Sequence, residues 1–289
     1  MRVAIIGGSG KMGRWFARLL LKEGKEVVIT GRNEGKLLEA RRELGVETAT
    51  NVDAVKRADV VVISVPIESV EPVIEQVSPY VRSEQVVIDI TSVKVLPVEA
   101  MHRHIKTGIT LGVHPMFGPG AKGLAGQNFA LTPTSDEERA LARKVREYLE
   151  ARGGRVVEMT PQEHDEMMTI VLGLSHFIAL VSADTLLSVD RQGLMRAVGG
   201  TTYRLLLTLV ESVVSEDAEL YASLQVNLPG VADVEELFRK GAESWLALVR
   251  SKDRQEFVKK MRAMRGKFEE ANPDFGKAYE MMYQIVDGS

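Results

Sequence analysis

The pattern of hydrophobic and polar residues divides the chain into two parts. In residues 1–160, short runs rich in Val and Ile alternate with segments whose apolar residues recur at helical spacing. Several of these runs are continuously apolar, as expected of parallel strands that are covered on both faces. Strands that alternate with helices form βαβ units, so this part predicts a Rossmann-type, doubly wound, mostly parallel sheet of an α/β protein. The predicted strands are Val3–Gly7, Val27–Thr30, Val60–Val65, Val86–Ile90, Ile109–Val113, Phe129–Thr132 and Arg155–Met159.

Residues 161–289 predict an all-α domain, because the strand pattern ends after Thr160. Asn227-Leu228-Pro229-Gly230 and Asn272-Pro273 should interrupt its helices. The stretch Glu163–Val189 is apolar on more than one face, so it should be buried. We expect a core helix rather than a membrane span, because the stretch is interrupted by Ser175, His176, Ser182 and Asp184. A subunit interface is a natural place for such a helix, which predicts a homodimer.

Composition narrows the classes of function. The length of 289 residues suits two domains, and the net charge of -3 gives no support for nucleic acid or an anionic membrane as a partner. The absence of cysteine excludes disulfides, thiolate nucleophiles and Cys-ligated metals. No His, Asp or Glu cluster has metal-ligand spacing, so we expect no metal. Because the first strand begins beside Arg2, we expect no signal peptide and a cytoplasmic protein.

A dinucleotide-binding motif follows the first predicted strand. Gly8-Ser9-Gly10-Lys11-Met12-Gly13 has the G-x-G-x-x-G spacing, with a strand before it and a helix after it. Gly8 should permit a tight turn, Gly10 a close approach of the pyrophosphate, and Gly13 close packing of helix on strand. The helix N-terminus would offer its N–H groups and positive dipole end to the phosphates.

The end of the second strand favours NADP over NAD. NAD sites usually have Asp or Glu here, whereas this strand ends in Gly31-Arg32-Asn33. Glycine removes the carboxylate that would repel a 2′-phosphate, Arg32 offers a bidentate donor, and Lys36 could add charge. A solvated basic turn is the alternative. Val65 and Pro66, which end another strand, should border the cofactor by their position.

Candidate catalytic residues lie in both parts of the chain. His114 opens the stiff segment His114-Pro115-Met116-Phe117-Gly118-Pro119 after a predicted strand, where it could act as an acid or base. Ser92 also follows a strand, and the helical part supplies His176 and Arg204. Each has a structural alternative: a hydrogen-bonding histidine, a helix cap, a core histidine and a surface charge, respectively. His164 beside Asp165 is either an ion-paired helix start or a functional group.

Taken together, these motifs resemble the prephenate/arogenate dehydrogenase family of tyrosine biosynthesis. The resemblance spans residues 1–225 and rests on Gly8–Gly13, Thr91–Lys94, His114–Pro119, His164-Asp165 with His176-Phe177, and Tyr203-Arg204 with Asp217, Leu220 and Tyr221. It implies a homodimer, formed through the helical domain, that oxidatively decarboxylates prephenate to 4-hydroxyphenylpyruvate with hydride transfer to a nicotinamide cofactor. The turn at Gly31-Arg32 favours NADP as that cofactor, which is a minority pattern in this family. Arogenate is the alternative substrate, with the same chemistry.

The resemblance also implies roles for individual residues. His114 would be the catalytic base that accepts the proton of the C4 hydroxyl, and Ser92 would hydrogen-bond that hydroxyl and the histidine. Arg204 would hold a substrate carboxylate, and His176 would line the same pocket. 

Other NADP proteins remain as alternatives. A β-hydroxyacid dehydrogenase should carry a catalytic lysine in its central helix, but Met167–Ala183 contains none. A deazaflavin-dependent NADP reductase would explain Thr30-Gly31-Arg32 without needing Ser92, His114 or Arg204. A non-catalytic NADP-sensing regulator would bind the cofactor without turnover.

Overall fold

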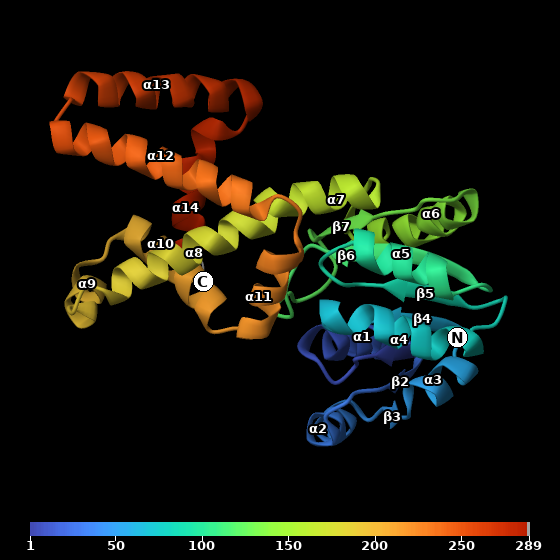
Figure 1. Cartoon of the computed structure of the whole chain (residues 1–289). Coiled ribbons are helices and arrows are strands. Elements are labelled where there is room, and N and C mark those ends of the chain that lie inside the picture. The colour runs from blue at the N-terminus through green and yellow to red at the C-terminus, as the bar shows by residue number, and fades with distance from the viewer. Residues whose placement is uncertain (288–289) are drawn as a thin grey trace. The chain divides into compact units, whose positions relative to one another are not determined.

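The computed structural model describes residues 1–287. The chain divides into two compact units, Met1–Met168 and Thr169 onward, and each is described by itself. The first unit holds every described strand, and the second is helical (Figure 1). The described fold is therefore the α/β architecture that the sequence predicts, followed by helices.

The first unit is built on an eight-stranded sheet in the order β3-β2-β1-β4-β5-β6-β7-β8. All neighbouring strands run parallel except β6 and β7, which are antiparallel. All seven predicted strands are present, and β3, a two-residue strand at the edge of the sheet, is the one described strand that was not predicted. The strands are β1 (Arg2–Ile6), β2 (Glu26–Ile29), β3 (Glu47–Thr48), β4 (Val60–Ile63), β5 (Val86–Asp89), β6 (Ile109–Pro115), β7 (Asn128–Leu131) and β8 (Arg155–Glu158).

Helices cover both faces of this sheet. The helices of one face are α3 (Asn51–Arg57), α4 (Val70–Val77) and α5 (Val95–His104), whose apolar side chains form one core cluster with the strands. Those of the other face are α1 (Lys11–Lys22), α2 (Glu34–Leu44) and α6 (Asp136–Glu150). The short helices η1 (Ile67–Ser69) and η2 (Ser78–Tyr80) flank α4, and α7 (Pro161–Met168) packs against α5. Ser135 caps α6 by accepting a hydrogen bond from the N–H of Glu138.

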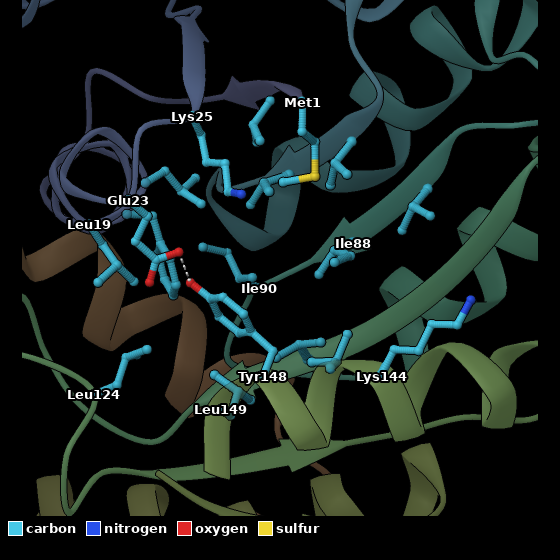
Figure 2. A pocket seen from close by; sticks show the side chains of 18 of the residues that line it. Met1, Leu19, Glu23, Lys25, Ile88, Ile90, Leu124, Lys144, Tyr148 and Leu149 are labelled. Atoms are coloured by element: carbon cyan, nitrogen blue, oxygen red, sulfur yellow. Dashed lines mark hydrogen bonds between the residues drawn. The ribbon is translucent and has the colours of Figure 1, made fainter. Parts of the chain in front are cut away.

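The crossovers leave part of the second face uncovered. Since the connections β3–β4, β4–β5 and β5–β6 pass over the first face, no crossover helix covers β4 and β5 between α1 and α6. A largely apolar cavity of about 260 Å³ lies there (Figure 2). At its edge the Tyr148 hydroxyl donates a 2.7 Å hydrogen bond to Glu23, which links α6 to the end of α1. Burial and this carboxylate raise the pKa of Tyr148.

The second unit continues the helix that begins with α7. A π-helical turn, η3 (Thr169–Leu174), leads into α8 (Ser175–Leu187), which packs against α10. The breaks predicted at residues 227–230 and 272–273 are confirmed, because α11 and α13 end there. The remaining helices are α9 (Gln192–Val198), α10 (Thr201–Val214), α11 (Ala218–Asn227), α12 (Val231–Ser251), α13 (Arg254–Ala271), η4 (Phe275–Lys277) and α14 (Ala278–Asp287).

The helical stretch Pro161–Leu187 is long and apolar enough to cross a membrane by length and composition alone. The expectation that the chain buries this stretch in its own core was wrong: only 17% of its most apolar window is buried. The exposed apolar side chains include Ile170, Val171, Leu180, Val181 and Leu187. This second unit therefore presents apolar surface that one chain leaves open.

We expect Gly7→Ala to lower the free energy of unfolding by about 3 kcal/mol or more. Gly7 has a φ of 82°, and a Cβ there would lie 2.1 Å from the carbonyl oxygen of Ser64. Gly24 has a similar φ of 70° but open space around it, so Gly24→Ala should cost only about 1–2 kcal/mol. Urea unfolding of both variants measures the difference, and equal losses would refute the steric argument.

Candidate functional site

The glycine loop joins β1 to α1 through close backbone contacts. Gly8 lies in the tight turn that the N–H of Gly10 closes on the carbonyl of Gly7, but the residue with positive φ is Gly7 rather than Gly8. Gly8 is instead required by packing, because a Cβ there would lie 2.6 Å from Cβ of Ile29 in β2. The packing role predicted for Gly13 is confirmed, since its Cβ would lie 2.6 Å from the carbonyl oxygen of Gly7.

The start of α1 fits the phosphates of a dinucleotide. Gly10 is the N-cap, its N–H donates to the carbonyl of Gly7, and α1 begins at Lys11. The next N–H groups, those of Met12 and Gly13, belong to the first turn, where a helix has no internal acceptors. A Cβ on Gly10 would lie 3.3 Å from the carbonyl oxygen of Gly7, so a side chain at this position would be tightly packed against the loop. A tight glycine loop followed by a helix N-terminus is a site for phosphate.

The end of β2 is basic and closed to side chains at Gly31. A Cβ on Gly31 would lie 2.3 Å from Oγ of Ser9, so this position cannot hold a carboxylate without displacing Ser9. Asn33 caps α2 by accepting the N–H of Lys36. Within residues 1–287, the side chains of Arg32 and Lys36 form no ion pair. This segment therefore carries two cations, Arg32 and Lys36, that form no ion pair within the described residues, and a carboxylate at position 31 would require Ser9 to move.

Val65 lies two residues beyond the end of β4 and close to this loop, because its Cγ1 would lie 3.0 Å from a Cβ on Gly7. Pro66 comes next in the chain and precedes η1. Gly31 and Val65 thus lie beside the glycine loop, as their positions after parallel strands predict.

His114 lies within a strand rather than after one. The sequence predicts that the strand ends at Val113, but β6 extends to Pro115 because β7 pairs with it in antiparallel fashion. His114 stands opposite Ala130 in that ladder and is 5% exposed. The backbone of this histidine is therefore fixed by the sheet, and the proline-rich segment only begins beyond it.

A lysine and an aspartate form a fully buried ion pair beside His114. The Lys94 ammonium, 0% exposed, pairs with the carboxylate of Asp89 at the end of β5. Lys94 also donates to the carbonyl oxygen of Val113 at 3.0 Å. The other oxygen of Asp89 accepts the N–H of Thr91 at 3.0 Å. This pair ties β5, β6 and the start of α5 together.

Two histidines and an aspartate form a buried chain of hydrogen bonds. Nδ1 of His114 lies 2.9 Å from Nε2 of His164, and Nδ1 of His164 lies 2.7 Å from Oδ1 of Asp165. The carboxylate of Asp165 also accepts the N–H of Lys94 at 2.7 Å and that of Val95 at 2.9 Å. Asp165 thus caps α5 from another helix, because Lys94, the N-cap residue, makes no side-chain cap of its own.

Electrostatics keep both histidines neutral near pH 7. Burial, with the neighbouring His164 and Lys94, holds the pKa of His114 well below 6.5. Burial lowers the pKa of His164 as well, although Asp165 opposes that shift. A neutral imidazole can accept a proton, so His114 is in the protonation state that a general base requires.

Ser92 lies in the turn between β5 and α5 and is half-buried. Within the described chain it makes no hydrogen bond to His114 or to any other group, and Lys94 rather than Ser92 is the N-cap of α5. The structural alternative of a helix cap is therefore excluded for Ser92. Its proposed contact with a hydroxyl group of the substrate stays a prediction.

The other two predicted residues belong to the second unit. His176 begins α8, packs edge-on against Tyr221 at 4.6 Å between ring centroids, and has no hydrogen-bond partner for its buried Nδ1 among the described residues. Burial lowers its pKa. Arg204 in α10 is ion-paired with Asp287 at 3.1 Å and donates to the carbonyl oxygen of Val286.

Sequence reasoning missed the buried ion pair of Lys94 with Asp89, and it considered Asp165 only as an ion-pair partner of His164, not as the cap of α5. A signal for the first was available, since Lys94 stands between a buried strand and the apolar start of a helix, where a cation needs a partner. No comparable signal marks Asp165 as the cap of α5, because 70 residues separate it from the N–H of Val95.

Comparison with known proteins gives two family matches. Residues 16–158 match the model described as "Prephenate dehydrogenase, nucleotide-binding domain". Residues 160–263 match "Prephenate dehydrogenase, dimerization domain". The two matches follow one another in the order of the two units and together cover most of the chain.

Two individual relatives and one solved structure illustrate the range of similar proteins. A "Probable arogenate/prephenate dehydrogenase" of Methanocaldococcus jannaschii is 37% identical over 91% of this chain, which spans only 60% of that relative's length. An "F420-dependent NADP reductase" of Methanothermobacter thermautotrophicus is 36% identical over 32% of this chain and 43% of its own length. Prephenate dehydrogenase from A. aeolicus, crystallised with hydroxyphenyl propionate and NAD+, shares the fold with a TM-score of 0.77 at 23% identity, over 94% of this chain and 98% of that one.

We expect the free energy of unfolding to fall as the pH is lowered below about 6.5. In the unfolded chain, His114 and His164 take up protons near that pH, whereas their folded pKa values are lower. The unfolded state therefore binds more protons between the two pKa values, and stability is lost there, at up to about 1.4 kcal/mol per pH unit for each histidine.

Urea unfolding at pH 7 and at mildly acidic pH measures this dependence. His114→Gln should flatten it, whereas the control His104→Gln, at a partly exposed histidine of α5, should not. An unchanged slope in His114→Gln would contradict the assignment of a neutral, buried His114.

Proposed function

Because this chain belongs to the prephenate dehydrogenase family, we propose that it oxidatively decarboxylates prephenate to 4-hydroxyphenylpyruvate. Arogenate, which differs in the side chain, is the alternative substrate. The observation that carries the proposal is the state of His114, which is neutral, fixed in a strand and bonded through Nδ1, in a unit that also holds a dinucleotide loop.

His114 acts as the base in this proposal. Its free nitrogen, Nε2, accepts the proton of the substrate's C4 hydroxyl, while the hydride on C4 leaves for the nicotinamide ring, which supplies the oxidising power when bound. A carbonyl group forms at C4. When the ring carboxylate leaves as CO₂, the electron pair of the broken C–C bond completes the aromatic ring, and the C4 oxygen takes up a proton to become the hydroxyl group of the product. Ser92, which makes no other hydrogen bond in the described chain, would orient the hydroxyl.

NADP is the cofactor we propose. Arg32, after β2, and Lys36, in the first turn of α2, form no ion pair within residues 1–287, and Gly31 stands where NAD sites use a carboxylate. A relative that matches 32% of this chain is named for NADP. The A. aeolicus protein, in contrast, was crystallised with NAD+, so the cofactor must be decided by measurement.

His176 and Arg204 are the proposed substrate contacts of the helical unit. The buried, unpartnered Nδ1 of His176 is the kind of atom that a polar ligand satisfies. Arg204 is about half exposed, so its ion pair with Asp287 contributes little and can be exchanged for a substrate carboxylate.

We also propose a homodimer formed through the helical unit. The matching family model is described as a dimerization domain, and the unit exposes apolar side chains along Pro161–Leu187. Burial of such a surface is favourable by about 25 cal/mol per Å².

The proposed activity predicts formation of reduced nicotinamide when the protein is mixed with substrate and cofactor. The four pairings of prephenate or arogenate with NADP or NAD are followed by absorbance. His114→Ala should lower kcat by roughly 10²- to 10⁴-fold, because the base is lost. If the wild-type protein forms no reduced nicotinamide with any of the four pairings, the proposal is wrong.

Cofactor choice is tested separately with Arg32→Ala. Loss of a charge-assisted phosphate contact should weaken NADP binding by roughly 10- to 150-fold, which corresponds to about 1.5–3 kcal/mol, and leave NAD binding nearly unchanged. Arg41→Ala, at an exposed arginine in the last turn of α2, is the matched control and should affect neither cofactor. Equal weakening of NADP and NAD by Arg32→Ala would contradict this assignment.

A further inference from the structure

The donors and acceptors of the buried chain can be assigned from its Asp165 end. Three groups converge on this carboxylate: the N–H of Lys94, the N–H of Val95, and Nδ1 of His164. The two backbone groups can only donate, which requires an acceptor. The carboxylate therefore accepts from His164 as well, and the proton of the neutral His164 ring is on Nδ1.

The assignment then passes from one histidine to the next. A neutral imidazole has one N–H, so Nε2 of His164 carries a lone pair and is an acceptor. Its partner at 2.9 Å, Nδ1 of His114, must be the donor. The single proton of the neutral His114 ring is thus on Nδ1, and the lone pair is on Nε2. No described group hydrogen-bonds to this Nε2.

We propose that His164 and Asp165 are positioning residues, which fix the tautomer of His114 so that Nε2 is always the atom that accepts a proton. This inference rests on the proposed function for its catalytic consequence, but the tautomer itself is a property of the free protein. Of the two neutral tautomers, only the one with a bare Nε2 can take the hydroxyl proton at that atom.

The same chain stabilises the charge that proton transfer creates. When Nε2 of His114 accepts a proton, the imidazolium still donates from Nδ1 to His164, and Nδ1 of His164 still donates to the Asp165 carboxylate. One O–H bond is broken and one N–H bond is formed, and the rest of the chain keeps its bonds. The negative charge of Asp165 lies two hydrogen bonds from the new cation, with no solvent exposure at His164 to screen it.

Packing alone makes a different prediction from hydrogen bonding at position 164. His164 is 0% exposed, so a residue that only filled space there could be replaced by Phe better than by a polar group. Hydrogen bonding requires an acceptor for Nδ1–H of His114, which Gln can present through its amide oxygen and Phe cannot.

The first experiment reads the tautomer of the free protein by nitrogen-15 NMR of its histidine rings. We expect the His114 ring to carry its proton on Nδ1 in the wild-type protein, and a mixture of tautomers in His164→Phe. A wild-type His114 protonated on Nε2 would overturn the proposal. This measurement needs neither substrate nor cofactor, so it stands even if the proposed activity is not found.

The second experiment measures kcat and KM of His164→Gln and His164→Phe. We expect His164→Phe to lose roughly 10²-fold or more in kcat with little change in KM, and His164→Gln to stay within about 10-fold of wild type. His164→Phe as active as His164→Gln would reduce the role of His164 to packing and overturn the proposal.

A matched pair of controls comes from His102 in α5, which also contacts a carboxylate. Its Nε2 lies 2.7 Å from Oε1 of Glu138. His102→Gln and His102→Phe should both leave kcat unchanged, because this histidine lies outside the chain that ends at His114.

Discussion

The carboxylate of Asp165 holds the candidate site together, because it accepts hydrogen bonds from three donors. It caps α5 through the N–H groups of Lys94 and Val95, and it accepts from the ring of His164. Its first role fixes the start of α5 and thereby the turn that carries Ser92. Its second role reaches His114 through His164. A single buried acceptor therefore sets both the backbone beside the proposed base and the ring of the base itself.

Burial at this edge of the sheet acts on several ionisable groups at once. The cation of Lys94 is stable there only because Asp89 and the carbonyl of Val113 surround it, since an isolated buried ammonium would cost several kcal/mol. Its charge in turn lowers the pKa of both His114 and His164. The ion pair thus contributes to chemistry without touching a reacting atom, because it helps to keep the base free of a proton near neutral pH.

Much of the first unit could be predicted from sequence because its signals are local. Continuous apolar strands and the glycine spacing follow from backbone rules within about ten residues. The exact end of β6 could not be predicted from sequence, because it depends on pairing with β7. The residue of the loop with positive φ could not be predicted either, because Gly7 and Gly8 are equivalent until Ile29 and Ser64 are in place. The link from Asp165 to α5 is equally non-local. Long-range partners, rather than local propensity, determine these features.

The position of His114 within the ladder decides how strong a base it can be. A strand fixes the imidazole more firmly than a loop, but it also buries the ring, and desolvation lowers its pKa. A base with a lowered pKa is unprotonated near neutral pH and can therefore accept a proton, but it binds that proton weakly. Lys94 adds to that weakness, whereas Asp165 raises the pKa of the next ring in the chain, that of His164. The hydrogen-bond chain therefore offsets the cost of burying the base. When His114 accepts a proton, the carboxylate at the end of the chain stabilises the new positive charge, which burial and Lys94 destabilise.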